Sequence, residues 1–167
     1  KDVLSPKDQM TVKADADNVL VLNYVDVKTG KFDIQDVYFM KAMHMLYDSN
    51  GFVMGNPWQH KIQYKQDYLM LDTFGTGSGF EVSYRFYVSE NADLSKLSDL
   101  SAVVERPELW DVYLNGRKLV KSDSWWIDRD FPRFPLGNNL IKGMNVLSLQ
   151  APKMSVHAEL MPAYIVG

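Results

Sequence analysis

The stretch FEVSYRFYV, residues Phe80–Val88, decides the fold of this chain. From Phe80 onward every second side chain is apolar or aromatic, and the side chains between them are Glu, Ser, Arg and Tyr. Successive side chains of a β-strand point to opposite faces of the sheet, so this alternation predicts a strand with one buried and one exposed face.

A β-hairpin is predicted downstream of this strand. The runs Trp110–Leu114 and Arg117–Val120 both have strand-like patterns, and Asn115-Gly116 lies between them. Asn-Gly favours the type I′ turn, because both central residues of that turn take a positive φ. The turn therefore determines which residues of the two strands face each other.

Short apolar runs elsewhere predict further strands, and one segment predicts a helix. The strand-like runs are Val19–Val27, Tyr68–Phe74, Ser101–Glu105, Asn145–Ala151 and Val156–Val166. The first of these is apolar on both faces, which predicts a central strand. Asp33 is placed to cap a helix over Val37–Tyr47, which Ser49-Asn50-Gly51 would end. Many short strands separated by turn residues are typical of an antiparallel β-sandwich, so we expect an all-β fold with a short helical insertion.

Charge and composition exclude several classes of protein. The chain has 167 residues, with 18 Lys and Arg against 21 Asp and Glu, a formal net charge of −3 and no cysteine. Without cysteine there is no disulfide, thiolate metal ligand or cysteine nucleophile. Acidic and basic residues are mixed between Glu105 and Arg133, which argues against a nucleic-acid-binding face, and no run of about 18 apolar residues predicts a membrane span. We expect one domain over residues 1–167, and because the chain begins at Lys1 without Met we expect it to be a fragment of a longer multidomain polypeptide.

The glycines and histidines do not predict a nucleotide or metal site. The run Gly75–Gly79 leads into a strand and not into a helix, so it is interpreted as a hairpin connection and not as a phosphate loop. His44, His60 and His157 are too far apart in the sequence for a short metal motif. His44 and His157 are therefore expected to have structural roles.

Acidic residues also give no motif for catalysis. The carboxylates that could be tested as a general acid and base are Glu105, Asp123, Asp128 and Asp130, but their spacing gives no support for such a pair. We therefore predict that this domain alone has no catalytic residue and no cofactor. A structural calcium ion is left open, because Asp15–Asn18 matches only the start of a calcium-binding loop.

The most unusual stretch is WWIDRDFPR, from Trp125 to Arg133. Adjacent residues on a strand point to opposite faces, so only one of the two tryptophans can easily enter the core. Aromatic rings beside Asp and Arg are suited to sugar binding, because pyranose C–H groups stack on the ring and hydroxyls bond to the charged side chains. The alternative is that one tryptophan covers the end of the core while the charged residues hold the connection. The candidate ligand contacts are Trp125, Trp126, Arg129 and Asp130, with Trp58 and His60 from a second aromatic loop.

Several short motifs follow one another in an order that resembles a known family. They are the strand Phe80–Val88, VERPELW at Val104–Trp110, VYLNG at Val112–Gly116, WWID at Trp125–Asp128 and LIKGMNVL at Leu140–Leu147. This succession resembles the galactose-binding-domain-like, sugar-binding-type β-sandwich of large bacterial glycoside hydrolases. It is similar to carboxy-terminal regions of α-L-rhamnosidases.

The resemblance implies a jelly-roll sandwich that acts as a non-catalytic, carbohydrate-binding-like accessory module of a polysaccharide-degrading enzyme. In such proteins the catalytic carboxylates lie in another domain. The implied partner is an oligo- or polysaccharide, and the implied location is periplasmic or extracellular. The alternative is a structural docking domain that buttresses the catalytic domain of the same polypeptide without binding sugar.

Overall fold

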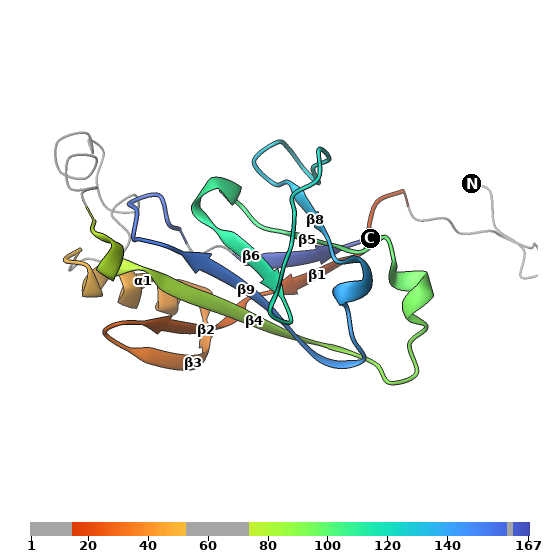
Figure 1. The fold of residues 1–167 in the computed structure, drawn as a ribbon, viewed down its shortest axis with the longest axis horizontal. Helices are drawn as coiled ribbons and strands as arrows, with labels where there is room; N and C mark the ends of the chain where they lie inside the picture. Colours follow the sequence, from red (N-terminus) through yellow and green to blue (C-terminus); the bar gives the residue numbers. More distant parts are fainter. Residues whose placement is uncertain (1–14, 53–73, 160–161) are drawn as a thin grey trace, which may run out of the picture.

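The computed structural model describes residues 15–52, 74–159 and 162–167, which form two β-sheets and an α-helix (Figure 1). The larger sheet has six strands in the order β3-β2-β4-β9-β6-β7, and the smaller has four in the order β1-β10-β5-β8. All of these strand pairs are antiparallel. The expected all-β sandwich with a short helical insertion is thereby confirmed.

The two sheets draw their strands from the whole length of the described chain. The six-stranded sheet contains β2 (Tyr24–Thr29), β3 (Asp33–Tyr38), β4 (Phe80–Val88), β6 (Asp111–Leu114), β7 (Arg117–Lys118) and β9 (Gly143–Ala151). The four-stranded sheet contains β1 (Val19–Leu22), β5 (Ser101–Val103), β8 (Arg133–Pro135) and β10 (Ala163–Val166). The α-helix is α1 (Phe39–Ser49), and short 3₁₀ helices occupy Thr76–Ser78, Leu94–Leu97, Pro107–Leu109 and Gly137–Asn139.

Strand β4 lies at the centre of the six-stranded sheet and has the bounds that the alternating sequence predicts. It pairs with β9 along its whole length, from Phe80 opposite Ala151 to Val88 opposite Gly143. The residues of β4 at odd positions in the strand are all buried, and those between them are partly or fully exposed. This strand therefore supplies one wall of the core with its inner face and a polar surface with its outer face.

The prediction of one central strand over Val19–Val27 was wrong. The segment forms two strands that belong to different sheets, because β1 pairs with β10 while β2 pairs with β3 and β4. Strand β1 is an edge strand, and its residues Val19 and Leu20 are 41% and 48% exposed. An apolar run does not reveal where a chain crosses from one layer to the other, so only the tertiary structure separates the two strands.

The predicted helix exists, but its start was misplaced. Asp33 lies in β3 and does not cap the helix, which begins at Phe39 after an extended Tyr38 that provides no side-chain cap. Its end agrees with the prediction, because Asn50 is the C-cap and Gly51 follows with a φ of 94°. A strand that runs directly into a helix leaves no capping residue for the sequence to reveal.

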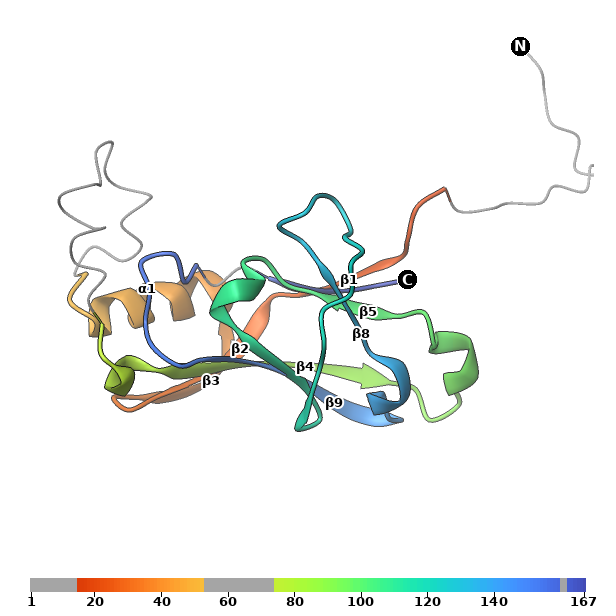
Figure 2. The ribbon, with the colours of Figure 1, turned by 45° about the horizontal axis from the view of Figure 1, so that its top comes forward.

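Helix α1 completes the layer formed by the four-stranded sheet. Figure 2 shows the helix on the same side of the six-stranded sheet as β1 and β5. Its buried residues are Ala42, Met43, Leu46 and Tyr47. The Tyr47 hydroxyl donates a hydrogen bond of 2.8 Å to the carbonyl oxygen of Val156, which ties the helix to the segment between β9 and β10.

The other local predictions are mostly confirmed. Asn115 and Gly116 have φ values of 51° and 78°, as a type I′ turn requires. The Gly75–Gly79 run makes a short 3₁₀ turn and leads into β4, so it is a connection between elements. Among the described residues of the predicted strand Val156–Val166, those that pair in a sheet are Ala163–Val166. Of the Tyr68–Phe74 prediction, all residues but Phe74 lie outside the described part of the chain.

A single cluster of buried apolar side chains joins the two sheets and the helix. Its fully enclosed members include Val27 of β2, Val82 of β4, Leu114 of β6 and Leu147 of β9. In residues 15–52, 74–159 and 162–167, α1 and the shorter helices lack the length and apolar character needed to cross a lipid bilayer.

Candidate functional site

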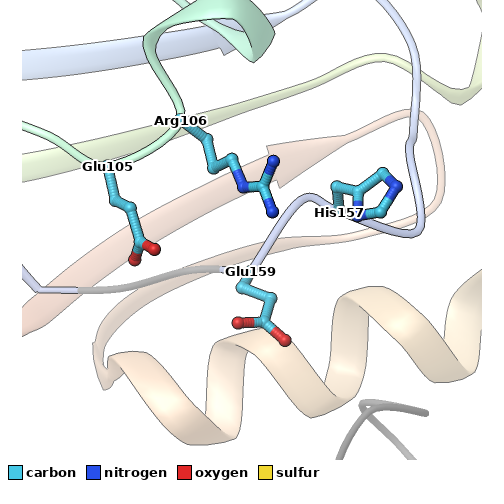
Figure 3. A pocket seen from close by; sticks show the side chains of 4 residues that line it. All are labelled: Glu105, Arg106, His157 and Glu159. Atoms are coloured by element: carbon cyan, nitrogen blue, oxygen red, sulfur yellow. The ribbon is translucent and has the colours of Figure 1, made fainter. Parts of the chain in front are cut away.

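A cavity of about 310 Å³, lined by charged and polar residues, lies where the chain leaves β5 and where it approaches β10. Its lining side chains are Glu105, Arg106, His157 and Glu159 (Figure 3). In Figure 3 the Arg106 guanidinium lies between the Glu105 carboxylate and the His157 imidazole. We call this cavity the Glu105 pocket.

The backbone on one side of the Glu105 pocket has an unusual conformation. Arg106 has φ 55° and ψ 57°, the left-handed region that a residue with a Cβ rarely adopts. The following Pro107 begins a 3₁₀ helix, in which the amide of Leu109 donates to the Arg106 carbonyl over 3.0 Å. The indole Nε1 of Trp110 donates to the Glu105 carbonyl over 3.1 Å. These bonds fix the backbone that carries the side chains of Glu105 and Arg106.

The other side of the pocket comes from the segment between β9 and β10. Met154, Val156 and Ala158 are buried, so the residues between them face outward. The amide of Glu159 donates to the His157 carbonyl over 2.8 Å, which holds the two pocket residues in a tight turn. The alternation of buried and partly exposed residues therefore directs His157 and Glu159 to the pocket.

The carboxylate of Glu105 lies in an unfavourable environment for negative charge. Burial raises the pKa of the Glu105 carboxyl, and the nearby negative charge of Glu159 raises it further. Arg106 opposes this increase, whereas Asp130 and Asp128 add to it. The pKa of Tyr164 is also raised, first by burial and then by the charge of Glu105.

Asp128 and Asp130, whose charges act on Glu105, belong to the segment of residues 122–132, which we call the tryptophan loop. The loop connects β7 to β8 and projects from the four-stranded sheet, away from the six-stranded one (Figures 1 and 2). Two backbone bonds shape it: the amide of Trp126 donates to Phe131 O over 3.0 Å, and the amide of Phe131 donates to Asp128 O over 3.1 Å. Two of its acidic residues, Asp128 and Asp130, raise the pKa of Glu105.

The two adjacent tryptophans have different environments. Trp126 is half-buried, and its ring packs on Tyr164 of β10 with 5.0 Å between ring centroids. Trp125 is 48% exposed, and the Arg129 guanidinium carbon lies 5.7 Å from the centroid of its ring. Neither indole is fully enclosed, so one aromatic surface lies beside the sheet and another faces outward.

The structure brings together part of the predicted contact set and adds residues that the sequence did not reveal. Trp125, Trp126, Arg129 and Asp130 share the tryptophan loop. Trp58 and His60 lie outside the described residues. The cavity-lining residues that the sequence did not suggest as candidate contacts are Glu105, Arg106, His157 and Glu159.

A sequence signal existed for one side of the Glu105 pocket only. Glu105-Arg106 directly follows the buried strand residues, and charged residues at a strand end often line a site. Glu105 was considered as a catalytic carboxylate and not as a binding group. His157 was expected to be structural within a strand, but it lies in the connection before β10 and lines the cavity.

Within the part of the chain that the structure describes, no three His, Asp or Glu side chains are grouped so that they could hold a metal ion. No model of a known protein family matches the sequence, and a search of curated proteins finds no match.

Proposed function

We propose that this chain is a non-catalytic carbohydrate-binding module, with its ligand held between the tryptophan loop and the Glu105 pocket. One observation carries the proposal: Tyr164, on which Trp126 packs, is paired with Val103 on the neighbouring strand, two residues before the cavity-lining Glu105. The effect of the Glu105 charge on the pKa of Tyr164 supports the closeness of the two parts.

The chemistry of this arrangement suits a sugar. The C–H face of a pyranose packs on an indole ring, and its hydroxyls donate to carboxylates and accept from a guanidinium. Trp126 offers the ring, Glu105 and Glu159 offer acceptors, and Arg106 offers donors. A cavity of about 310 Å³ is at the lower end of the size range of small-ligand sites, which suits one or two sugar rings.

Binding is tested by titration of the protein with a panel of plant and host glycans, followed by calorimetry. For a glycan that binds, Trp126→Ala is expected to weaken the affinity by about tenfold or more, because stacking on the ring is lost. Arg106→Asn is a second variant that removes the guanidinium, and asparagine tolerates the left-handed backbone at this position.

The matched control is Arg117→Asn, since Arg117 is exposed on β7 of the other sheet. It is expected to leave the affinity unchanged. Absence of heat with every glycan, or an affinity that survives both Trp126→Ala and Arg106→Asn in folded protein, would overturn the proposal.

The wider context is part of the same proposal. The order of motifs resembles accessory sandwiches of bacterial glycoside hydrolases, which supports a module of a periplasmic or extracellular polysaccharide-degrading enzyme. A catalytic domain encoded in the same gene is the expected finding. A gene that encodes this sandwich alone would contradict it.

A second candidate function is docking against the catalytic domain of the same polypeptide. The observation that favours it is an apolar groove of about 360 Å³, lined by residues that include Val19, Leu20, Val88, Leu97 and Leu100. The lining of the groove also includes Asn18, just before β1, and Gly167, just after β10. These two residues exchange two backbone hydrogen bonds of 3.1 and 3.2 Å. In the full-length polypeptide, docking predicts one shared thermal transition that Leu20→Lys splits into two. Independent transitions in the unmodified polypeptide would exclude docking.

A further inference from the structure

We infer that the Glu105 pocket selects its saccharide by charge, accepting neutral sugars, favouring sugars with a free amino group and rejecting uronic acids and sulfated sugars. The inference rests on the proposed carbohydrate-binding function and names the class of ligand for the same site. The aromatic surface and the cavity define that site, and the charges around it determine which sugars can enter.

The charged and titratable groups around Glu105 come from three parts of the chain. Its own segment contributes Arg106, the segment before β10 contributes Glu159 and His157, and the tryptophan loop contributes Asp128 and Asp130. The aromatic neighbour on β10 is Tyr164, and burial and the charge of Glu105 raise the pKa of its hydroxyl. Two carboxylates therefore line the cavity, and two more act electrostatically on Glu105.

The positive charges near the site are partly used in other contacts. The Arg106 guanidinium lies 3.6 Å from Glu108 Oε1, and the Arg129 guanidinium packs on the ring of Trp125. Arg133, at the base of the tryptophan loop, forms an ion pair with Asp17. The balance of charge at the pocket is consequently negative, so an anionic sugar is repelled and a cationic one is attracted.

Selection by charge should also make the binding of amino sugars depend on pH, through the protonation of Glu105. Its pKa is raised by burial and by the surrounding carboxylates, so a bound cation is expected to lower that pKa again. An amino sugar should therefore release a proton on binding and bind more tightly as the pH rises through the pKa of Glu105. A neutral sugar, which forms no ion pair, should show a much smaller dependence.

The experiment compares matched monosaccharides in NMR chemical-shift titrations of the ¹⁵N-labelled protein. The probes are the neutral, 2-amino and uronic acid forms of glucose, galactose and mannose. Within the series that binds, each change of charge is expected to alter the affinity by about fivefold or more at low salt, and high salt should reduce the difference.

Two charge-removing variants and a control locate the effect. Glu159→Gln and Asp130→Asn should each bring the affinities for amino and uronic sugars closer together, while Asp33→Asn, exposed on β3 of the other sheet, should not. If a uronic acid binds as tightly as its neutral form, the charge inference fails and the carbohydrate-binding proposal survives. If none of the sugars and none of the glycans binds, both fail.

Discussion

At the scale of single residues, Asn145 links two turns that are separate motifs in the sequence. Its side chain is fully buried, with Nδ2 donating to Ile141 O over 2.7 Å and to Gly143 O over 3.1 Å. Its Oδ1 accepts from the amide of Ile141 over 3.0 Å and from the Asn115 side chain over 2.9 Å. The Asn-Gly hairpin and the Gly-x-Asn turn therefore share one hydrogen-bonded centre, which explains in physical terms why they occur together.

Asn145→Ala is expected to lower the free energy of unfolding by about 2 kcal/mol or more, because three partly buried backbone groups and the side chain of Asn115 lose their partner. Urea denaturation measures the change. Asn138→Ala, at an exposed position in the same connection, is the control and should have almost no effect. Equal stability of the two variants would contradict the role of Asn145.

Gly79 is required for a different reason, namely the close approach of two chain segments at the start of β4. A Cβ at this position would lie 2.8 Å from the carbonyl oxygen of Pro152 and 3.0 Å from that of Ala151. Gly79→Ala is therefore expected to cost about 1 to 3 kcal/mol, since backbone must shift to relieve the overlap.

Gly77→Ala serves as the matched control, because a Cβ there would have no atom within 4 Å. It should leave the melting temperature unchanged or raise it slightly through a less flexible unfolded chain. If the Gly79→Ala protein had the same melting temperature as the unmodified chain, the steric argument would be disproved.

At the scale of elements, α1 contributes to the fold through its packing and not through its capping. It begins without a side-chain cap, yet it buries a stripe of residues and makes the buried hydrogen bond from Tyr47 to Val156. Val156 lies one residue before His157, so the helix also supports the segment that forms one side of the Glu105 pocket. Helix α1, which interrupts the otherwise all-β fold, thus helps to hold one side of the Glu105 pocket in place.

Tyr47→Phe removes the hydroxyl that joins α1 to this segment. The expected loss is about 1 to 2 kcal/mol, because the Val156 carbonyl stays buried and loses a partner. Thermal unfolding followed by circular dichroism measures it. Tyr24→Phe, at an exposed tyrosine of β2, should have no comparable effect.

At the scale of the whole molecule, the candidate site is assembled by the sandwich from distant parts of the chain. Glu105 follows β5, Glu159 precedes β10, and Asp128 and Asp130 arrive from the loop between β7 and β8. Strands β8, β5 and β10 are neighbours in the four-stranded sheet, which brings these segments to one region. Burial raises the pKa of Glu105, and the like charges of these segments raise it further.

The raised pKa leads to a prediction about stability and pH. The folded state holds the Glu105 proton to a higher pH than the unfolded state, so ionisation of this group opposes folding as the pH rises through the window between the two pKa values. Glu105→Gln cannot ionise. It is therefore expected to melt at a higher temperature than the unmodified protein at pH 7, and the difference should shrink below about pH 4.

An NMR titration of the Glu105 carboxyl carbon tests the cause directly. In Glu159→Gln the pKa of Glu105 should fall toward the ordinary range of a glutamate, since one of the charges that raises it has been removed. A Glu105 pKa at the ordinary value in the unmodified protein would contradict the arrangement of the site.

The sequence by itself determined the antiparallel sandwich, the bounds of β4 and the type I′ hairpin, because side-chain alternation and turn chemistry depend only on near neighbours. It also identified Trp125–Arg133 as the most unusual stretch, without deciding whether its tryptophans contact a ligand or cover the core. Only the tertiary structure decided that Val19–Val27 divides between two sheets, that the helix starts without a cap, and that Glu105, Arg106, His157 and Glu159 share a cavity. The physical reason is that these properties arise from pairing between strands distant in sequence, and no local pattern of residues records which strands will become neighbours.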